Sequence, residues 1–372
     1  MLHILTQCYP SVIMLKVAPA ICGGNMLKKF AAVVLITILI LNLAACADIK
    51  EEQRRYTAEF LKLFDTVTQI IGYAGSEEEF RNHAELIHDK LEEYHQLYDI
   101  YNSYEGVNNI RTINENAGIE PVKVDRRIID LLLFAKQAYE MTDGQVNVAL
   151  GAVLKIWHEH REAGLEDPEK ATLPDMERLQ KASEHTDISQ VIIDEENSTV
   201  YLADPEMSLD VGGIAKGYAT EQVARIAEEN GFTSGLISVG GNVRSIGVRG
   251  DGNQWKVGIQ NPFDQNGEDI RKVHLTDASL VTSGVYERYY TVNGKNYHHI
   301  IDPDTLYPAD YYVSVTILCQ DSGMADALSK IFNMPFEEGL ALVESLPDTE
   351  ALWVFPDGHI ETSSRFGDYL AD

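Results

Sequence analysis

Apolar residues recur at every third or fourth position in several parts of the chain, which is the spacing of one face of a helix. Such spacing runs from Ser76 to Tyr98, where Ser76 and Glu79 form a plausible capping box. The same pattern predicts further helices over residues 126–141, 150–157, 214–230, 322–333 and 335–346. The charged stretch 158–170 breaks the pattern and is interpreted as a solvated surface loop.

Alternating apolar and polar residues predict strands in the segments between these helices. The predicted strands cover residues 64–73, 191–194, 199–203, 235–239, 243–248, 255–260, 273–275, 312–319 and 351–355. A hairpin is expected over residues 286–301, with its turn at Asn293-Gly294. Strands and helices do not follow a regular βαβ rhythm, so the expected fold class is α+β (mixed α/β), with largely antiparallel sheets flanked by helices.

The N-terminal region has the features of a bacterial secretory signal. Lys28 and Lys29 precede a short aliphatic run over residues 30–41, and Leu43-Ala44-Ala45-Cys46 resembles a lipobox. This pattern predicts that Cys46 is lipid-modified, becomes the mature N-terminus and anchors the protein on the extracytoplasmic face of the cell membrane. An uncleaved anchor helix is the alternative, and it would leave the rest of the chain on the same side.

These features divide the chain into three parts. Residues 1–45 are upstream residues and signal peptide, with Met26 as the expected start, and residues 46–62 are an anchor linker. Residues 63–372 have a length that suits one large domain or two intimately packed lobes. After cleavage Cys319 is the only cysteine besides Cys46, so neither an internal disulfide nor a thiolate metal site is expected. The formal net charge of −28 disfavours nucleic acid as a partner and limits membrane contact to the lipid anchor.

The segment Leu209–Tyr218 joins a strand end to a helix start and has the composition of an anion-binding turn. Gly212 and Gly213 allow main-chain N–H groups to face a ligand, and Lys216 adds a positive charge. The segment has neither the P-loop pattern nor the G-x-G-x-x-G spacing. An ordinary strand-to-helix turn is the alternative interpretation.

Two further segments contain candidate catalytic or metal-binding side chains. His298 and His299 end the predicted hairpin and are followed by Asp302-Pro303. A histidine at this place is a candidate general base. The alternative is an ordinary pair of strand histidines, with one ring packed and the other facing out. Asp326 lies near the start of a helix, where a carboxylate either caps the helix or binds a hard cation such as Mg²⁺.

Taken in order, these motifs resemble the ApbE family, the FAD:protein FMN transferases, over about residues 63–357. The matching segments are residues 144–147, 209–218, 238–242, 283–289, 298–309 and 325–329. The resemblance implies a cleft that binds FAD with Mg²⁺ on its diphosphate. A threonine or serine hydroxyl of an acceptor protein of flavin-dependent electron transfer would attack the phosphorus on the riboflavin side and release AMP.

The resemblance also assigns roles to residues of this chain. It implies that the residues contacting FAD are Phe64, Tyr101, Gln145, Val146, Asn147, Asp210, Lys216, His299 and Ile300. His299 is the expected base. The expected metal ligands are a main-chain oxygen of Gly213, the carboxylate of Asp326 and, as a helper, Ser329.

Two residues depart from the family pattern. Lys330 stands where the family usually has threonine, so it weakens the metal site, replaces part of the metal's charge, or turns away while Ser329 substitutes. Leu306 stands where the family prefers glycine, which implies an altered turn if that position needs a positive φ. Two other functions therefore stay open: an Mg²⁺-dependent FAD pyrophosphatase giving FMN and AMP, and a non-catalytic flavin-binding lipoprotein.

Overall fold

The computed structural model of the chain describes residues 53–264 and 267–371. These residues fall within one compact unit that begins at Glu52. The predicted signal peptide and Cys46 lie outside the described residues, so the lipid anchor stays a prediction. None of the helices in the described part of the chain combines the length and apolar character needed to cross a bilayer.

An eight-stranded sheet organises the unit, with strand order β1-β2-β6-β7-β10-β13-β14-β15 and antiparallel pairing between all neighbours. Its strands are β1 (Arg54–Leu61), β2 (Val67–Ala74), β6 (Gly235–Val239), β7 (Asn242–Ile246), β10 (Ser279–Gly284), β13 (Ser314–Cys319), β14 (Glu350–Val354) and β15 (Ile360–Thr362). All six residues of β13 are buried, because helices and loops cover both faces of the sheet there. The predicted α+β class is confirmed.

Three small sheets surround the large one. One pairs β11 (Tyr289–Val292) with β12 (Lys295–His298), and another pairs β8 (Trp255–Ile259) with β9 (Arg271–Leu275). The third has β5 (Thr199–Leu202) in its centre, between β3 (Val122–Lys123) and β4 (Val191–Asp194). The hairpin β11-β12 turns where the sequence predicts. Asn293 and Gly294 have φ angles of 51° and 80°, the left-handed conformations that a two-residue hairpin turn requires.

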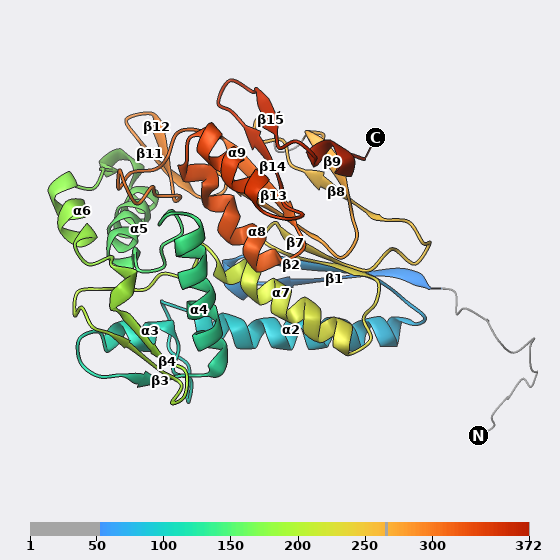
Figure 1. Ribbon diagram of the computed structural model, residues 1–372, viewed down its shortest axis with the longest axis horizontal. Helices are drawn as coiled ribbons and strands as arrows, with labels where there is room; N and C mark the ends of the chain where they lie inside the picture. The colour runs from blue at the N-terminus through green and yellow to red at the C-terminus, as the bar shows by residue number, and fades with distance from the viewer. Residues whose placement is uncertain (1–52, 265–266, 372) are drawn as a thin grey trace, which may run out of the picture. The chain divides into compact units, whose positions relative to one another are not determined.

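Helices α2, α7 and α8 pack against one face of the large sheet (Figure 1). The α-helices are α2 (Glu77–Tyr98), α3 (Ile110–Glu115), α4 (Arg126–Met141), α5 (Gly151–Glu166), α6 (Met176–Ser183), α7 (Ala215–Glu229), α8 (Ser322–Leu328) and α9 (Phe336–Ser345). Short 3-10 helices are η1 (Leu63–Asp65), η2 (Pro168–Lys170), η3 (Ile188–Gln190), η4 (Ser329–Asn333) and η5 (Phe366–Tyr369). The largest apolar core, with Ile70, Ile87 and Ile237 fully buried, lies between the sheet and these helices.

The helix start at Ser76 follows the expected cap in most respects. Ser76 Oγ accepts a hydrogen bond from the N–H of Glu79 at 3.1 Å. The Glu79 carboxylate accepts from the N–H of Gly75 at 2.9 Å, one residue earlier than a capping box requires. Both bonds satisfy N–H groups that would otherwise lack partners at the helix start.

Two predicted loops are regular structure. The N-terminal part of the folded unit includes β1, which pairs along its whole length with β2, so the proposed linker 46–62 ends earlier than predicted. The charged stretch 158–170 is mostly helix α5, and the prediction of a surface loop is wrong there. Trp157 and Gly164 are buried on one side of α5, while Glu159, Glu162 and Glu166 are exposed. Burial along one side is enough to extend a helix that is otherwise polar.

Leu306 keeps a left-handed conformation although it is not glycine. Its φ is 61° and its side chain is buried in the apolar cluster with Leu150 and Val153. Its carbonyl oxygen accepts a hydrogen bond from Trp157 Nε1 at 2.9 Å. Packing of the side chain and this buried hydrogen bond offset the backbone strain, so the turn retains a positive φ rather than changing form.

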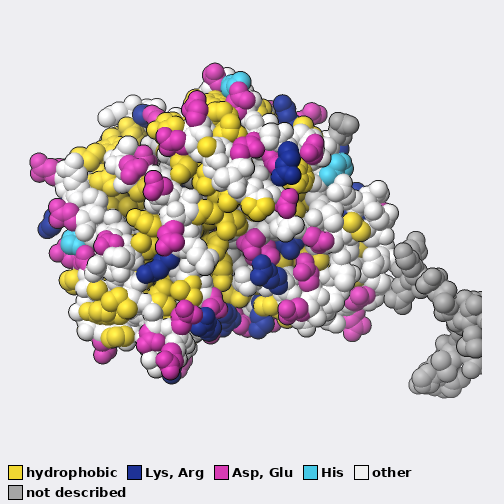
Figure 2. All heavy atoms as spheres, in the orientation of Figure 1, with side chains coloured by type: hydrophobic (Ala, Val, Ile, Leu, Met, Phe, Trp, Pro, Cys, Tyr) yellow, Lys and Arg dark blue, Asp and Glu magenta, His cyan; other side chains and the backbone are white. Residues whose placement is uncertain are grey.

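The surface is acidic over much of the face shown in Figure 2, where Asp and Glu side chains are distributed among fewer Lys and Arg side chains. This distribution agrees with the formal charge of −28.

Candidate functional site

One cavity of about 570 Å³ brings the predicted motifs together. Most of the predicted site residues line it, namely Phe64, Tyr101, Gln145, Val146, Asn147, Asp210, Gly213, Lys216, His299, Ile300 and Asp326. Ser329 is the exception, because it is fully buried and does not line the cavity. A cavity of this size, with apolar walls and a few convergent polar groups, is typical of a small-molecule site.

The glycine turn and the start of α7 form one wall of the cavity. The carboxylate of Asp210 accepts a hydrogen bond from the N–H of Gly212 at 2.8 Å and so holds the turn in shape. Burial raises the pKa of Asp210, although the Gly212 N–H and the nearby His158 and Lys216 act to lower it. Helix α7 begins directly after this turn, and the partial positive charge at its N-terminus favours an anion in the cavity.

Asp326 connects three segments that are distant in sequence. Its Oδ2 accepts hydrogen bonds from the N–H of Gly217 and from Asn242 Nδ2, each at 2.8 Å. Only 2% of the residue is exposed. The carboxylate, on α8, is thus hydrogen-bonded to helix α7 and to the start of strand β7.

The contact between α7 and α8 requires glycine at position 217. A Cβ atom there would lie 2.3 Å from the carbonyl oxygen of Ser322 and 2.4 Å from Cβ of Asp326. Both distances are far below van der Waals contact. The two helices can approach this closely only because the side chain is absent.

We expect Gly217→Ala to lower the stability by about 1–3 kcal/mol, because the methyl group forces the helices apart. Thermal unfolding of the variant measures the effect, with Gly367→Ala as the matched control because no atom lies within 4 Å of its added Cβ. Equal melting temperatures for the two variants would show that the α7-α8 contact is not as tight as described.

The two histidines have different roles, as one of the two interpretations of the sequence anticipated. His298 is buried, its Nε2 lies 2.6 Å from the carbonyl oxygen of Ala309, and its Nδ1 accepts from the N–H of Ile300. His299 faces the cavity, and its Nδ1 lies 3.2 Å from the carbonyl oxygen of Arg288. A carbonyl oxygen only accepts, so Nδ1 of His299 carries the proton and Nε2 is left as the acceptor.

Desolvation within the cleft is the largest cause that lowers the pKa of His299, to about 3, and the nearby Lys330, Lys216 and Arg288 lower it further. The ring is exposed to the open cavity, so solvent moderates the size of this shift but not its direction. The hydrogen bond to Arg288 acts in the opposite sense and is outweighed. His299 is therefore neutral at physiological pH, as a general base must be.

The lowered pKa of His299 predicts how the transfer rate depends on pH. Since the folded pKa of His299 lies below the ordinary value, we expect the acid limb of kcat/KM to fall well below pH 6.5 and the rate to vary little between pH 6 and 8. The shift also makes protonation favour the unfolded chain, so this residue contributes to a loss of stability as the pH falls below about 6.5. A pH series of initial rates checks the first statement. An acid limb near pH 6.5 that disappears in His299→Gln would contradict it.

The expected magnesium ligands do not fit a metal ion as they are placed. Asp326 Oδ2 is occupied by two N–H donors, and Asp326 Oδ1 faces Lys330 Nζ at 3.6 Å. Ser329 Oγ donates to the carbonyl oxygen of Asp326 at 2.6 Å and accepts from Lys330 Nζ at 3.0 Å. Mg²⁺ needs oxygen ligands at about 2.1 Å, whereas here an ammonium group already contacts the same oxygen atoms.

Another group of ligand-type side chains lies elsewhere. Within residues 53–264 and 267–371, the one cluster of three or more His, Cys, Asp or Glu side chains close enough to share an ion is His88, Asp89 and Glu92. These residues lie on α2, largely exposed, and do not line the cavity.

The predicted flavin-wall residues are held by local hydrogen bonds. Gln145 donates through Nε2 to Asp304, while its Oε1 is buried without a partner in the described part of the chain. Asn147 donates to the carbonyl oxygen of Thr186. Tyr101 is half exposed at the rim, and its ring lies 5.2 Å from that of His158.

Several cavity residues were not predicted. Arg161 and His158 reach the cavity from the stretch that was interpreted as a loop, and Arg288 and Asn242 come from segments that matched the family without being assigned a role. The helical spacing of Trp157, His158 and Arg161 was the available signal for the first two. No sequence pattern marks Arg288, because its place depends on how the hairpin β11-β12 packs.

Comparison with known proteins agrees with this geometry. The model of the ApbE family matches residues 64–353. A FAD:protein FMN transferase of Treponema pallidum is 35% identical over 274 residues, covering 70% of this chain and 74% of the relative. A FAD:protein FMN transferase of Klebsiella pneumoniae is 33% identical over 261 residues, covering 68% and 77%.

Solved structures show the same fold. The crystal structure of the ApbE protein of Thermotoga maritima superposes with a TM-score of 0.75 at 30% identity, covering 86% of this chain and all of that chain. The flavin transferase ApbE of Vibrio cholerae superposes with a TM-score of 0.70 at 24% identity, and this likeness concerns the fold alone. On the family match and the identity to its relatives, this chain belongs to the ApbE family.

Proposed function

We propose that this protein transfers FMN from FAD to a threonine or serine hydroxyl of an acceptor protein and releases AMP. The proposal rests on three groups that line one cavity: the turn at Gly212-Gly213, Lys216 and His299. The turn and Lys216 are suited to bind an anion. His299 is neutral and presents Nε2 as a proton acceptor. Relatives at 33–35% identity bear the name FAD:protein FMN transferase, which supports the same conclusion.

The chemistry is a single displacement at phosphorus. The acceptor hydroxyl oxygen forms a bond to the phosphorus on the riboflavin side of FAD, the bond from that phosphorus to the bridging oxygen breaks, and AMP leaves with the bridging oxygen. Nε2 of His299 receives the hydroxyl proton and passes it to solvent. The turn and α7 stabilise the diphosphate charge, so the side chains supply mainly position and electrostatics.

The test is an incubation of the full-length protein with FAD and a candidate acceptor from flavin-dependent electron transfer. Flavin fluorescence that stays on the acceptor after denaturation, together with one AMP per flavin, is the expected result. Free FMN and AMP without labelled acceptor would instead establish the pyrophosphatase reaction. FAD binding with no product of either kind would establish the non-catalytic flavin-binding protein.

The location is a separate part of the proposal. We infer from Leu43-Ala44-Ala45-Cys46 that the mature protein is lipid-anchored through Cys46 on the extracytoplasmic face of the membrane, where its acceptors would also lie. We expect Cys46→Ser to abolish labelling by a fatty-acid analogue and to shift the protein toward the soluble fraction. Cys319→Ser, a buried cysteine, is the matched control. Equal labelling of both variants would contradict the anchor.

A further inference from the structure

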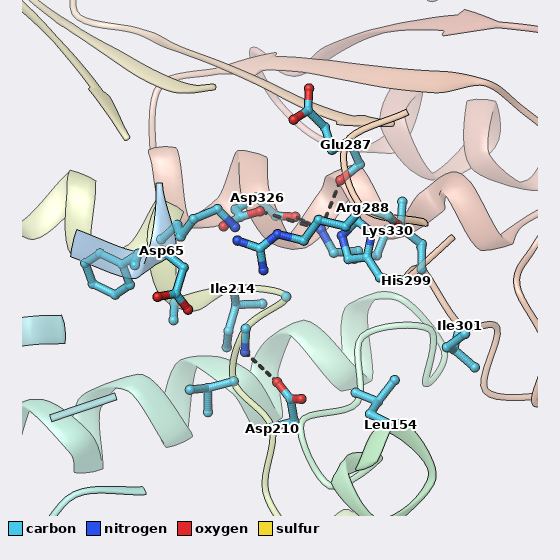
Figure 3. A pocket seen from close by; sticks show the side chains of 18 of the residues that line it. Asp65, Leu154, Asp210, Ile214, Glu287, Arg288, His299, Ile301, Asp326 and Lys330 are labelled. Carbon is cyan, nitrogen blue, oxygen red and sulfur yellow. Dashed lines mark hydrogen bonds and ion pairs between the residues drawn. The ribbon is translucent and has the colours of Figure 1, made fainter. Parts of the chain in front are cut away.

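Lys330 extends into the space that the family's metal is expected to occupy. Its Nζ lies 3.0 Å from Ser329 Oγ, 3.1 Å from Ser283 Oγ and 3.4 Å from the carbonyl oxygen of Asp326. The carboxylate oxygen Oδ1 of Asp326 is 3.6 Å away. Figure 3 shows the lysine beside Asp326, with its interactions drawn as dashed lines. Four oxygen atoms thus surround one nitrogen.

The same side chain reaches the glycine turn on the other wall. A Cβ atom on Gly213 would lie 3.4 Å from Cε of Lys330, which is ordinary van der Waals contact. Gly213 and Asp326 are, with Ser329 as a helper, the metal ligands that the family resemblance implies. Lys330 therefore fills the gap between them and does not turn away.

The surrounding hydrogen bonds suit an ammonium group. Ser329 Oγ gives its proton to the carbonyl oxygen of Asp326 at 2.6 Å, so toward Lys330 it presents lone pairs. Ser283 Oγ lies 2.7 Å from Ser329 Oγ and also faces Nζ. A protonated lysine has three N–H donors and no acceptor, which matches a set of oxygen acceptors. Burial lowers the pKa of Lys330 below its ordinary value, and the charge of Asp326 opposes this shift only in part.

We propose that the ammonium group of Lys330 is the built-in cation of the diphosphate site, so that this chain binds FAD and transfers FMN without a divalent metal ion. The inference rests on the proposed function, because it identifies what neutralises the diphosphate in that site. A lysine provides one positive charge at a fixed place, with the same oxygen contacts that would otherwise bind the metal. Metal content and chelators then have no effect on the site.

The first test needs no variant. FAD affinity of the full-length protein is measured by quenching of flavin fluorescence, once with EDTA and once with millimolar MgCl₂. We expect the two Kd values to agree within about twofold, since the cation belongs to the chain. A tightening of about tenfold or more with MgCl₂ would overturn the inference, whereas a failure to bind FAD under both conditions would contradict the proposed function itself.

Variants of Lys330 provide the second test. Lys330→Met keeps the length and removes the charge, and we expect FAD affinity to fall about tenfold or more with or without MgCl₂. Lys330→Thr opens the space and provides the hydroxyl of the family pattern, so we expect FAD binding that depends on MgCl₂. Lys170→Met, an exposed lysine outside the cavity, is the matched control.

A readout independent of FAD separates the outcomes. Thermal unfolding of each protein with MgCl₂ alone reports metal binding. We expect no shift for the wild-type protein and a rise in melting temperature for Lys330→Thr. A rise for the wild-type protein that persists in Asp89→Asn, which removes a carboxylate of the surface cluster on α2, would show that a metal binds beside the lysine. This result would overturn the inference even if both Lys330 variants unfold.

Discussion

Replacing His299 by alanine is expected to reduce flavin transfer by about 10²–10⁴-fold while FAD affinity changes only a few-fold. The ring faces the cavity with Nε2 free, and its Nδ1–H is fixed by the carbonyl oxygen of Arg288, so the lost group is the proton acceptor. Single-turnover transfer to the acceptor measures the rate, and quenching of flavin fluorescence measures binding.

His359→Ala is the matched control for this experiment. That histidine is exposed, pairs with Glu361 near β15 and does not line the cavity, so we expect transfer at the wild-type rate. If His299→Ala transferred FMN as fast as this control, another group would have to take the hydroxyl proton. A loss of FAD affinity equal to the loss of rate would instead make His299 a binding residue.

Replacing Asp326 by asparagine is expected to reduce the rate of FMN transfer by about 10²-fold or more. The substitution removes the negative charge that faces the ammonium group of Lys330 in the cavity. The amide oxygen of asparagine can still accept from Gly217 and Asn242, but its NH₂ group would then face Lys330 Nζ, donor against donor. The ammonium group loses its carboxylate partner, although its contacts with Ser283 and Ser329 remain.

Asparagine is a more informative substitution than alanine at this position. Asp326→Ala would leave two buried N–H donors without an acceptor, each costing about 1–3 kcal/mol, so lost folding would be confused with lost activity. Thermal unfolding of Asp326→Asn should show a nearly normal melting temperature. Asp368→Asn, an exposed carboxylate outside the cavity, is the control. Full activity of Asp326→Asn would remove this carboxylate from the site.

Regular periodicity made several elements predictable. Helix α4 and strand β6 have the predicted bounds, because their apolar residues recur with periods of 3.6 and 2. Strand β4 also has the predicted bounds, as a short run of Val and Ile residues. Strand β10 was missed, since its residues are mostly buried on both faces and show no alternation. Strand β1 was missed because its polar residues indicated a linker, although pairing with β2 stabilises it.

Most of the candidate site followed from local motifs. The glycine turn, His299 and Asp326 each stand in a short segment whose residue types indicate a chemistry, and all three line the cavity. Arg288 and Arg161 could not be predicted in this way, because a charged residue on a helix or hairpin gives no sign of the wall it will face.

The sequence by itself indicated the ApbE family, the α+β class and the segments that contain the candidate site residues. These depend on residue types at fixed spacing, which can be read without the fold. Only the tertiary structure decided where the side chain of Lys330 lies. The sequence left it free to weaken a metal site, replace its charge or turn away. Its Nζ lies 3.1 Å from Ser283 Oγ, which folding brings from β10. Gly213 leaves room for the side chain, because a Cβ atom added there would lie 3.4 Å from Cε of Lys330.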